Sequence, residues 1–232
     1  MMISLYYWFY LANPDDIPSN KQLVEKMNRV FPAANVAHIQ DKIRLDEKHI
    51  FIPFISSKDE YGVSYWIWTK HKWELVNINT TGSPEVWNIK EKNPSTHFIV
   101  WNIHPDDQLE TIKFHLLKDR GYRIADGVER YHPKVQMEET ISLKENSYGA
   151  ISIPEDWTQI IKSYRNIEPV QSFSFFNHYG FSQYYIYYGW TSYDQYGNQT
   201  FPGNSVNGNG YSNRDYNIDF MMIMDEAKLE SK

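Results

Sequence analysis

The sequence predicts an α+β protein dominated by β-structure, in which a helix packs on an antiparallel meander and a β-sandwich or open-barrel-like region follows. Aromatic residues make up 16% of the 232 residues, including 18 Tyr and 8 Trp, and aromatic side chains favour strands over helices. Short runs rich in β-branched and aromatic residues recur between turn residues. Helical patterns are confined to two short segments.

The chain is long enough for one large β domain or two modest ones, and either can bury a core without a metal or a disulfide. It contains no cysteine, which excludes thiol nucleophiles, Cys-zinc sites and disulfides. We divide it into an apolar N-terminal segment at 1–12, a helix-on-sheet domain at 13–104 and a β-rich domain at 105–232. Within the last, residues 191–217 have little aliphatic content, which predicts a long polar surface loop.

The first twelve residues carry no charge and are rich in aromatic side chains. They are fewer than the roughly 20 residues that a helix needs to span a bilayer, and they lack the basic start and small-residue cleavage site of a signal peptide. One interpretation makes them a strand or a core-packing segment. The other makes them the outer end of a membrane anchor, with Tyr6, Tyr7, Trp8 and Tyr10 at the lipid–water interface.

Residues 19–31 are expected to form the helix of the first domain. Ser19 can cap its N-terminus, and Gln22 stands three residues later as the second half of a capping box. Pro32 ends the helix. The side chains that fall on one face, and that should be buried against a sheet, are those of Leu23, Met27, Val30 and Phe31.

The meander is centred on a hairpin at residues 61–80. Two runs rich in aromatic and β-branched residues flank the polar segment 69–72, a pattern typical of strand, tight turn and strand. The remaining strands of the first domain are expected at 36–45, 50–55, 86–89 and 97–103.

The second domain begins after a junction at residues 104–107. Pro154 at the first turn, followed by two acidic residues, predicts a short helix at 154–164. Strands are expected at 112–116, 122–124, 137–143, 148–153, 170–176, 183–190 and 218–224.

Net charge and motifs argue against several classes of function. The formal charge is −6, from 29 acidic and 23 basic residues, and the basic residues are scattered, so we expect no nucleic-acid partner. The chain has no Gly-x-Ser-x-Gly elbow, no phosphate-binding or dinucleotide-binding glycine loop and no His-Glu-x-x-His helix. We therefore predict no cofactor and lean away from an enzyme.

Four residues near the junction could in principle ligate a metal, namely His97, His104, Asp106 and Asp107. Imidazole and carboxylate groups are suitable ligands, but their spacing matches no metal motif. His-Pro-Asp-Asp is equally well explained as a turn. We predict no metal site.

An aromatic run near the C-terminal end is the candidate ligand-binding surface. Alternate strand residues point to the same face, so Tyr185 and Tyr187 should share one face, opposite Tyr184 and Tyr188. One face can pack while the other offers flat rings and hydroxyl groups to a sugar or a peptide. The candidate residues are Tyr184, Tyr185, Tyr187, Tyr188, Trp190 and Tyr193.

Together these features favour a non-enzymatic binding or accessory protein of a bacterial cell envelope, outside the cytoplasm and tethered through residues upstream of, or including, the first twelve. Its partner would be an envelope protein or a glycan. The alternative is a small-ligand enzyme of hydrolase type in the cytoplasm, with a pocket between the helix at 19–31 and the first sheet and with His38 or His97 available for chemistry.

Overall fold

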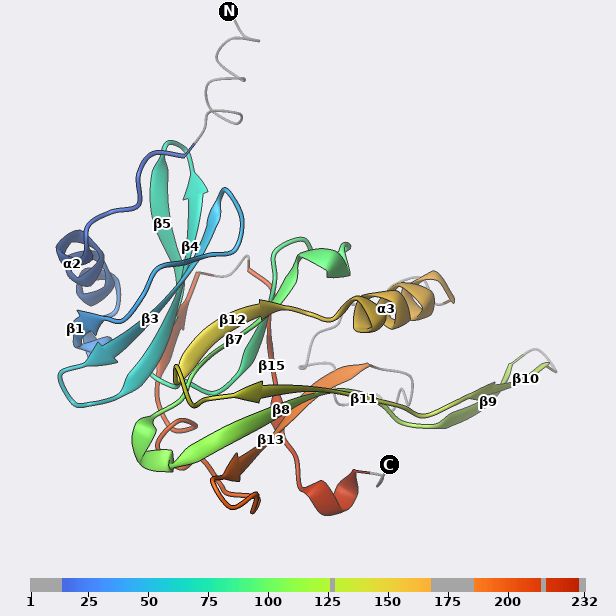
Figure 1. Ribbon diagram of the computed structural model, residues 1–232. Coiled ribbons are helices and arrows are strands. Elements are labelled where there is room, and N and C mark those ends of the chain that lie inside the picture. Colours follow the sequence, from blue (N-terminus) through green and yellow to red (C-terminus); the bar gives the residue numbers. More distant parts are fainter. Residues whose placement is uncertain (1–13, 126–127, 168–185, 214–215, 230–232) are drawn as a thin grey trace, which may run out of the picture.

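The computed structural model (Figure 1) is dominated by antiparallel β-structure, as the sequence predicts. It describes residues 14–125, 128–167, 186–213 and 216–229. Within these ranges, two α-helices accompany three layered sheets and a two-stranded arm. The predicted strand at 170–176 and the N-terminal segment at 1–12 lie outside the described residues.

Sheet A contains the predicted meander. Its strands are β1 (Val36–Ile39), β2 (Ile43–Arg44), β3 (His49–Ser56), β4 (Tyr61–Thr69), β5 (Lys72–Asn79) and β14 (Gly210–Ser212). The β4–β5 hairpin turns through Lys70 and His71, whose φ angles are 49° and 58°. Positive φ at both central residues is the requirement of a two-residue type I′ turn, whose twist matches that of the flanking strands.

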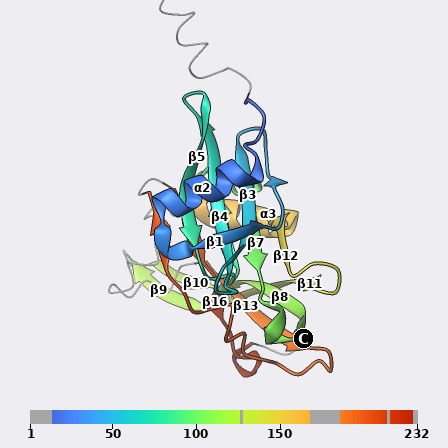
Figure 2. The same ribbon diagram turned by 90° about the vertical axis from the view of Figure 1, so that its left-hand side faces the viewer.

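Helix α2 (Asn20–Val30) lies across the outer face of sheet A (Figure 2). Its predicted capping box is confirmed, because the Ser19 hydroxyl accepts the backbone N–H of Gln22 and the Gln22 side chain accepts the backbone N–H of Ser19. Leu23 and Met27 are buried in one apolar cluster with side chains of sheet A. Side chains therefore fill the space beneath the helix, where the alternative enzyme hypothesis places a pocket.

Sheet B is the middle layer and is apolar on both faces. Its strands, in spatial order, are β12 (Tyr148–Ser152), β7 (His97–Asn102), β6 (Glu85–Asn88) and β15 (Ile218–Phe220). Trp87 and Val100 pack against the inner face of sheet A. Ile99 and Trp101 point the other way, into the core shared with sheet C.

Sheet C closes this second core. Its strands, in spatial order, are β11 (Val135–Ser142), β8 (Leu109–Lys118), β13 (Tyr187–Asp194) and β16 (Met222–Ile223). Helix α3 (Glu155–Ile167), which confirms the predicted helix and runs three residues beyond it, adds Trp157 and Ile161 to the core. Short 3-10 turns lie at Pro32–Ala34, Pro94–Thr96, Pro105–Asp107 and Glu226–Lys228.

Strands from the two sides of residue 104 share sheets. β12 and β15 flank β7 and β6 in sheet B, and β14 pairs with β5 in sheet A. The predicted division at 104/105 therefore runs through two sheets.

The polar segment 191–217 is partly built into the body. β13 continues to Asp194, which places the first four residues of the predicted loop in a strand. Ser205 is fully buried, and its hydroxyl donates to the Asp107 carboxylate and accepts the backbone N–H of His104. Hydrogen bonds, rather than aliphatic packing, hold this segment against the fold, and composition does not reveal them.

The arm consists of β9 (Gly121–Ala125) and β10 (Val128–His132) and extends the ribbon formed by β8 and β11. It projects from the body beyond α3 (Figure 1). The sequence predicts β9 but not β10.

Candidate interaction site

The structure separates the predicted aromatic residues onto the two faces of β13. Tyr188 and Trp190 are buried in the core between sheets B and C, where the Tyr188 ring lies 6.5 Å from that of Trp157, measured between centroids. Tyr184 and Tyr185 lie outside the described residues, so their predicted role stays a prediction.

Tyr187 and Tyr193 lie on the opposite face of β13, as strand alternation predicts. The Tyr187 hydroxyl donates to the Asp119 carboxylate over 3.4 Å, and burial, together with the charge of Asp119, raises the pKa of Tyr187. Tyr193 is buried, and the ammonium of Lys113 lies 5.0 Å from its ring centroid. Both rings already have partners within the chain.

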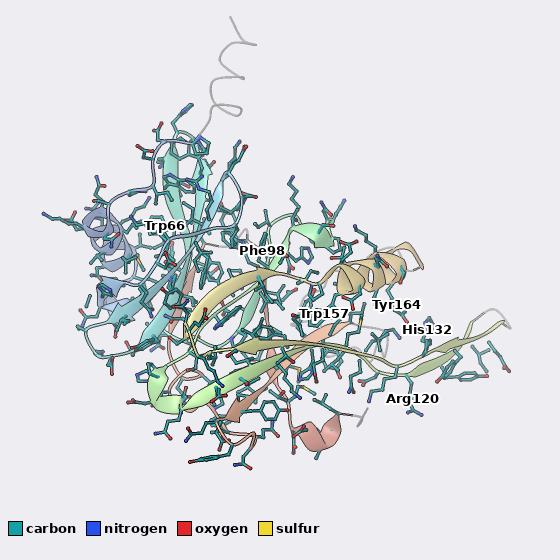
Figure 3. All side chains as sticks on the ribbon, viewed as in Figure 1. Trp66, Phe98, Arg120, His132, Trp157 and Tyr164 are labelled. Carbon is teal, nitrogen blue, oxygen red and sulfur yellow. The ribbon has the colours of Figure 1, made fainter. Side chains whose placement is uncertain are left out.

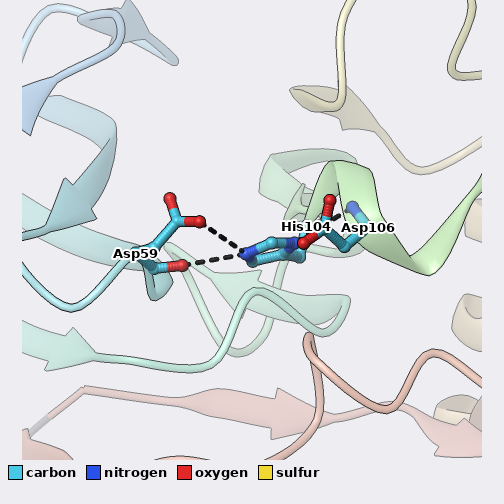
Figure 4. A group of neighbouring side chains, drawn as sticks. All are labelled: Asp59, His104 and Asp106. Atoms are coloured by element: carbon cyan, nitrogen blue, oxygen red, sulfur yellow. Dashed lines mark hydrogen bonds and ion pairs between the residues drawn. The ribbon is translucent and has the colours of Figure 1, made fainter.

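A second candidate is the group formed by Asp59, His104 and Asp106 (Figure 4). Each side chain places one ligand-type atom within 4.8 Å of the others. The buried His104 imidazole approaches the Asp59 backbone carbonyl oxygen at 2.9 Å and the Asp59 carboxylate at 3.6 Å, both through Nε2.

The protonation of His104 follows from its hydrogen bonds. Nδ1 accepts the backbone N–H of Asp106 over 3.1 Å, so the ring proton of the neutral imidazole is on Nε2 and is donated to the Asp59 carbonyl. A histidine that binds a metal through one nitrogen normally donates the N–H of the other, and His104 has the opposite arrangement. The group therefore joins the β3–β4 turn to the turn at Pro105–Asp107. This agrees with the explanation of the His-Pro-Asp-Asp sequence as a turn.

The other residues singled out in the sequence are dispersed. His38 is exposed on β1, whereas His97 is buried on β7 with Nε2 3.3 Å from the Lys90 carbonyl oxygen. The Asp107 carboxylate accepts two hydrogen bonds of 2.9 Å from Asn204, one from its backbone and one from its side chain. The structure does not bring these groups together.

The arm presents large apolar side chains to solvent. Tyr122, Ile124 and Tyr131 are 52%, 61% and 65% exposed. Tyr122 and Tyr131 are directly opposite each other in the β9–β10 ladder, and residue 124 lies two positions from 122, so all three share one face. We call these three side chains the apolar face of the arm. The exposed Glu129 is directly opposite Ile124 on the same face, and its carboxylate accepts a hydrogen bond from the Tyr122 hydroxyl.

This face continues a face that is buried in the body. The register of the arm follows that of β8 and β11 without a shift, so Tyr122 alternates in phase with Phe114, and Tyr131 with Met137. Phe114 is buried in the core between sheets B and C, and Met137 packs against it. Beyond Arg120 and His132, at the base of the arm in Figure 3, the ribbon extends past α3 and its apolar side chains become exposed.

Sequence reasoning missed this site because the charged residues around Glu129 interrupt the apolar pattern of β10. One local signal could have found it: Asp126-Gly127 is a dipeptide typical of a two-residue hairpin turn. This turn signal predicts the hairpin but does not indicate that its apolar side chains are exposed to solvent.

The chain matches no protein-family model, and no curated protein or solved structure matches it. No helix within the described ranges is long and apolar enough to cross a membrane.

Proposed function

We propose that this chain is a non-enzymatic binding protein and that the apolar face of the arm is its binding surface. The observation that carries the proposal is the continuation of a core-forming face that no described element covers, with three large apolar side chains exposed on one side of a two-stranded ribbon. A two-stranded hairpin is marginally stable alone in water, and clustered exposed apolar side chains mark interaction sites in soluble proteins.

The polar groups support a binding role over a catalytic one. His104 and Asp107 form hydrogen bonds with backbone and side-chain groups of the chain and so stabilise the turns around them. A nucleophile and its base need a position beside them where substrate can sit, and these groups are directed at the protein itself.

We further propose that the chain works in a bacterial envelope, outside the cytoplasm. The uncharged aromatic segment at 1–12 and the absence of cysteine support this location. Fractionation of the native host, with protease added outside intact cells, tests it. Membrane-associated and cleaved protein is expected, whereas soluble and protected protein would contradict it.

Site-directed crosslinking in the native host tests the binding surface. A photoreactive phenylalanine analogue replaces Tyr131 in one variant and, as the matched control, Phe201 in another, because Phe201 is 66% exposed but lies outside the arm. We expect a discrete crosslinked product from position 131 and none from position 201. Absence of a product at 131 would contradict the proposal.

A further inference from the structure

We infer that the partner of the arm is a basic polypeptide segment, which places an arginine or lysine side chain on the rings of Tyr122 and Tyr131 with its charge beside the Glu129 carboxylate. This inference rests on the proposed binding role of the arm, for which it names the class of partner.

The arm presents two aromatic rings and one carboxylate to solvent on the same side. Tyr122 and Tyr131 are directly opposite each other in the β9–β10 ladder and are 52% and 65% exposed. Glu129 is exposed and lies two positions from Tyr131 on the same face, and its carboxylate accepts a hydrogen bond from the Tyr122 hydroxyl. The face of an aromatic ring and a carboxylate both attract a cation.

The charge on this face of the ribbon is negative. Positions 123 and 130 are paired in the ladder and alternate to the opposite face of the ribbon, which leaves Glu129 as the charged residue that the β9–β10 ladder places beside the two tyrosines. The whole chain carries a formal charge of −6, so its long-range field also attracts a cationic partner. A nucleic acid or an anionic membrane surface would be repelled by both.

The body of the protein already holds a cation between a tyrosine and a glutamate. The ammonium of Lys113 on β8 lies 5.0 Å from the ring centroid of Tyr193 and 3.8 Å from the Glu138 carboxylate on β11. β8 and β11 are the strands that the arm extends. The arm therefore repeats, on a solvent-exposed face, a combination of side chains that binds a lysine within the same ribbon.

A basic side chain of a polypeptide fits this face better than a small cation or a sugar. Ile124 is 61% exposed and directly opposite Glu129, so a ligand that covers the face must supply apolar atoms as well as a charge. Arginine and lysine supply both, because their methylene stems pack on apolar surface while the charged end reaches a carboxylate. A neutral sugar would stack on the rings but would leave the carboxylate without a counter-charge.

The length of the arm suits a short extended segment. Each arm strand has five residues and spans roughly 17 Å, which matches a peptide of about five residues. The basic side chain then lies near the centre of the contact, and apolar side chains on either side of it pack on the two tyrosines and Ile124.

NMR of the purified full chain, with 13C-labelled isoleucine methyl groups, provides the test, because Ile124 lies within the proposed contact. Its signal is assigned by its loss in Ile124→Val. The probe is an acetylated and amidated peptide of sequence Ala-Leu-Arg-Leu-Ala, and the control peptide carries citrulline in place of arginine, which keeps the shape and removes the charge. We expect the arginine peptide to shift the Ile124 signal with a Kd of about 1 mM, and the citrulline peptide to bind at least about fivefold more weakly.

Variants separate the carboxylate from the rings. Glu129→Gln retains an acceptor for the Tyr122 hydroxyl but removes the charge, so it should raise the Kd of the arginine peptide at least about fivefold and leave that of the citrulline peptide unchanged. Glu145→Gln, the matched control, removes an exposed carboxylate outside the arm and should change neither. Combining Tyr122→Leu with Tyr131→Leu keeps apolar surface and removes the rings, so the preference for arginine should fall at least about threefold. Circular dichroism confirms that each variant remains folded.

Equal affinity for the arginine and citrulline peptides would overturn the inference, as would an Ile124 signal that the arginine peptide leaves unshifted up to about 10 mM, or a Kd unaffected by Glu129→Gln. The proposed function fails separately, by crosslinking from position 131 in the host. If the crosslinked product forms equally well in a Glu129→Gln background, the arm is still a binding surface, but a basic segment is not its partner. If no product forms at all, the proposed function itself fails.

Discussion

The β4–β5 hairpin and the arm are both antiparallel ribbons that carry aromatic residues, but their environments are opposite. In the first, Tyr65 and Trp66 are at most 1% exposed, whereas Tyr122 and Tyr131 in the arm are more than half exposed. The difference arises because α2 and sheet B cover the two faces of β4, and no described element covers the apolar face of the arm. An aromatic strand is thus core or interface depending on the layers that reach it.

The largest expected loss of stability comes from a substitution in the β4–β5 hairpin. Trp66→Ala should lower the free energy of unfolding by about 3–5 kcal/mol, because it opens a cavity in the cluster beneath α2 and removes the indole N–H that donates to Ser64 over 3.0 Å. Urea denaturation measures the loss. Trp66→Phe, the control, should cost less, and an equal cost would contradict the cavity explanation.

Glu85, which contacts the same hairpin, makes the stability of the protein depend on pH. Its carboxylate accepts hydrogen bonds from the Tyr65 hydroxyl and the Asn79 amide, but burial raises its pKa above the ordinary 4.5. The folded state then binds the proton more tightly than the unfolded state, so stability falls as pH rises from about 4.5 to the folded-state pKa and is constant above it.

Glu85→Gln should remove this loss, which amounts to about 1.4 kcal/mol for each unit of pKa difference. Denaturant unfolding of both proteins from acidic to neutral pH measures it. Parallel stability curves for the two proteins would show that Glu85 does not contribute the dependence.

The turn of the β4–β5 hairpin can be made more stable by substitution. Lys70 and His71 adopt positive φ, a conformation that costs side-chain-bearing residues about 1 kcal/mol or more. Combining Lys70→Asn with His71→Gly should raise the free energy of unfolding by about 1 kcal/mol. Thermal unfolding measures the gain, and an unchanged or lower Tm would argue against strain in this turn.

The smallest effect is expected in the arm. Replacing both Tyr122 and Tyr131 by Ser in the purified chain should change the free energy of unfolding by less than about 1 kcal/mol, the value of a cross-strand pair. Urea denaturation provides the measurement. A loss comparable to that of Trp66→Ala would mean that the body covers this face, and the contrast between the hairpins would disappear.

The sequence predicts best those elements that depend on interactions between residues close in the chain. The capping box of α2 involves residues three positions apart, and the β4–β5 hairpin needs only a two-residue turn between alternating strands. β10 and β14 were missed because charged or small polar residues dilute their apolar alternation. The arm likewise lacks a dense aromatic run, whereas the densest aromatic run in the sequence places Tyr188 and Trp190 in the core.

The sequence by itself determined the β-dominated class, the two helices and the alternation that places Tyr187 and Tyr188 on opposite faces, because propensity and periodicity act between residues close in the chain. Only the tertiary structure decided which faces are covered. β15 reaches β6, β12 reaches β7 and Ser205 reaches Asp107 across long stretches of chain. The apolar alternation of a strand does not specify which distant strand or sheet will pack against it. Trp66 is therefore buried and Tyr131 exposed only because of how the sheets pack in the tertiary structure.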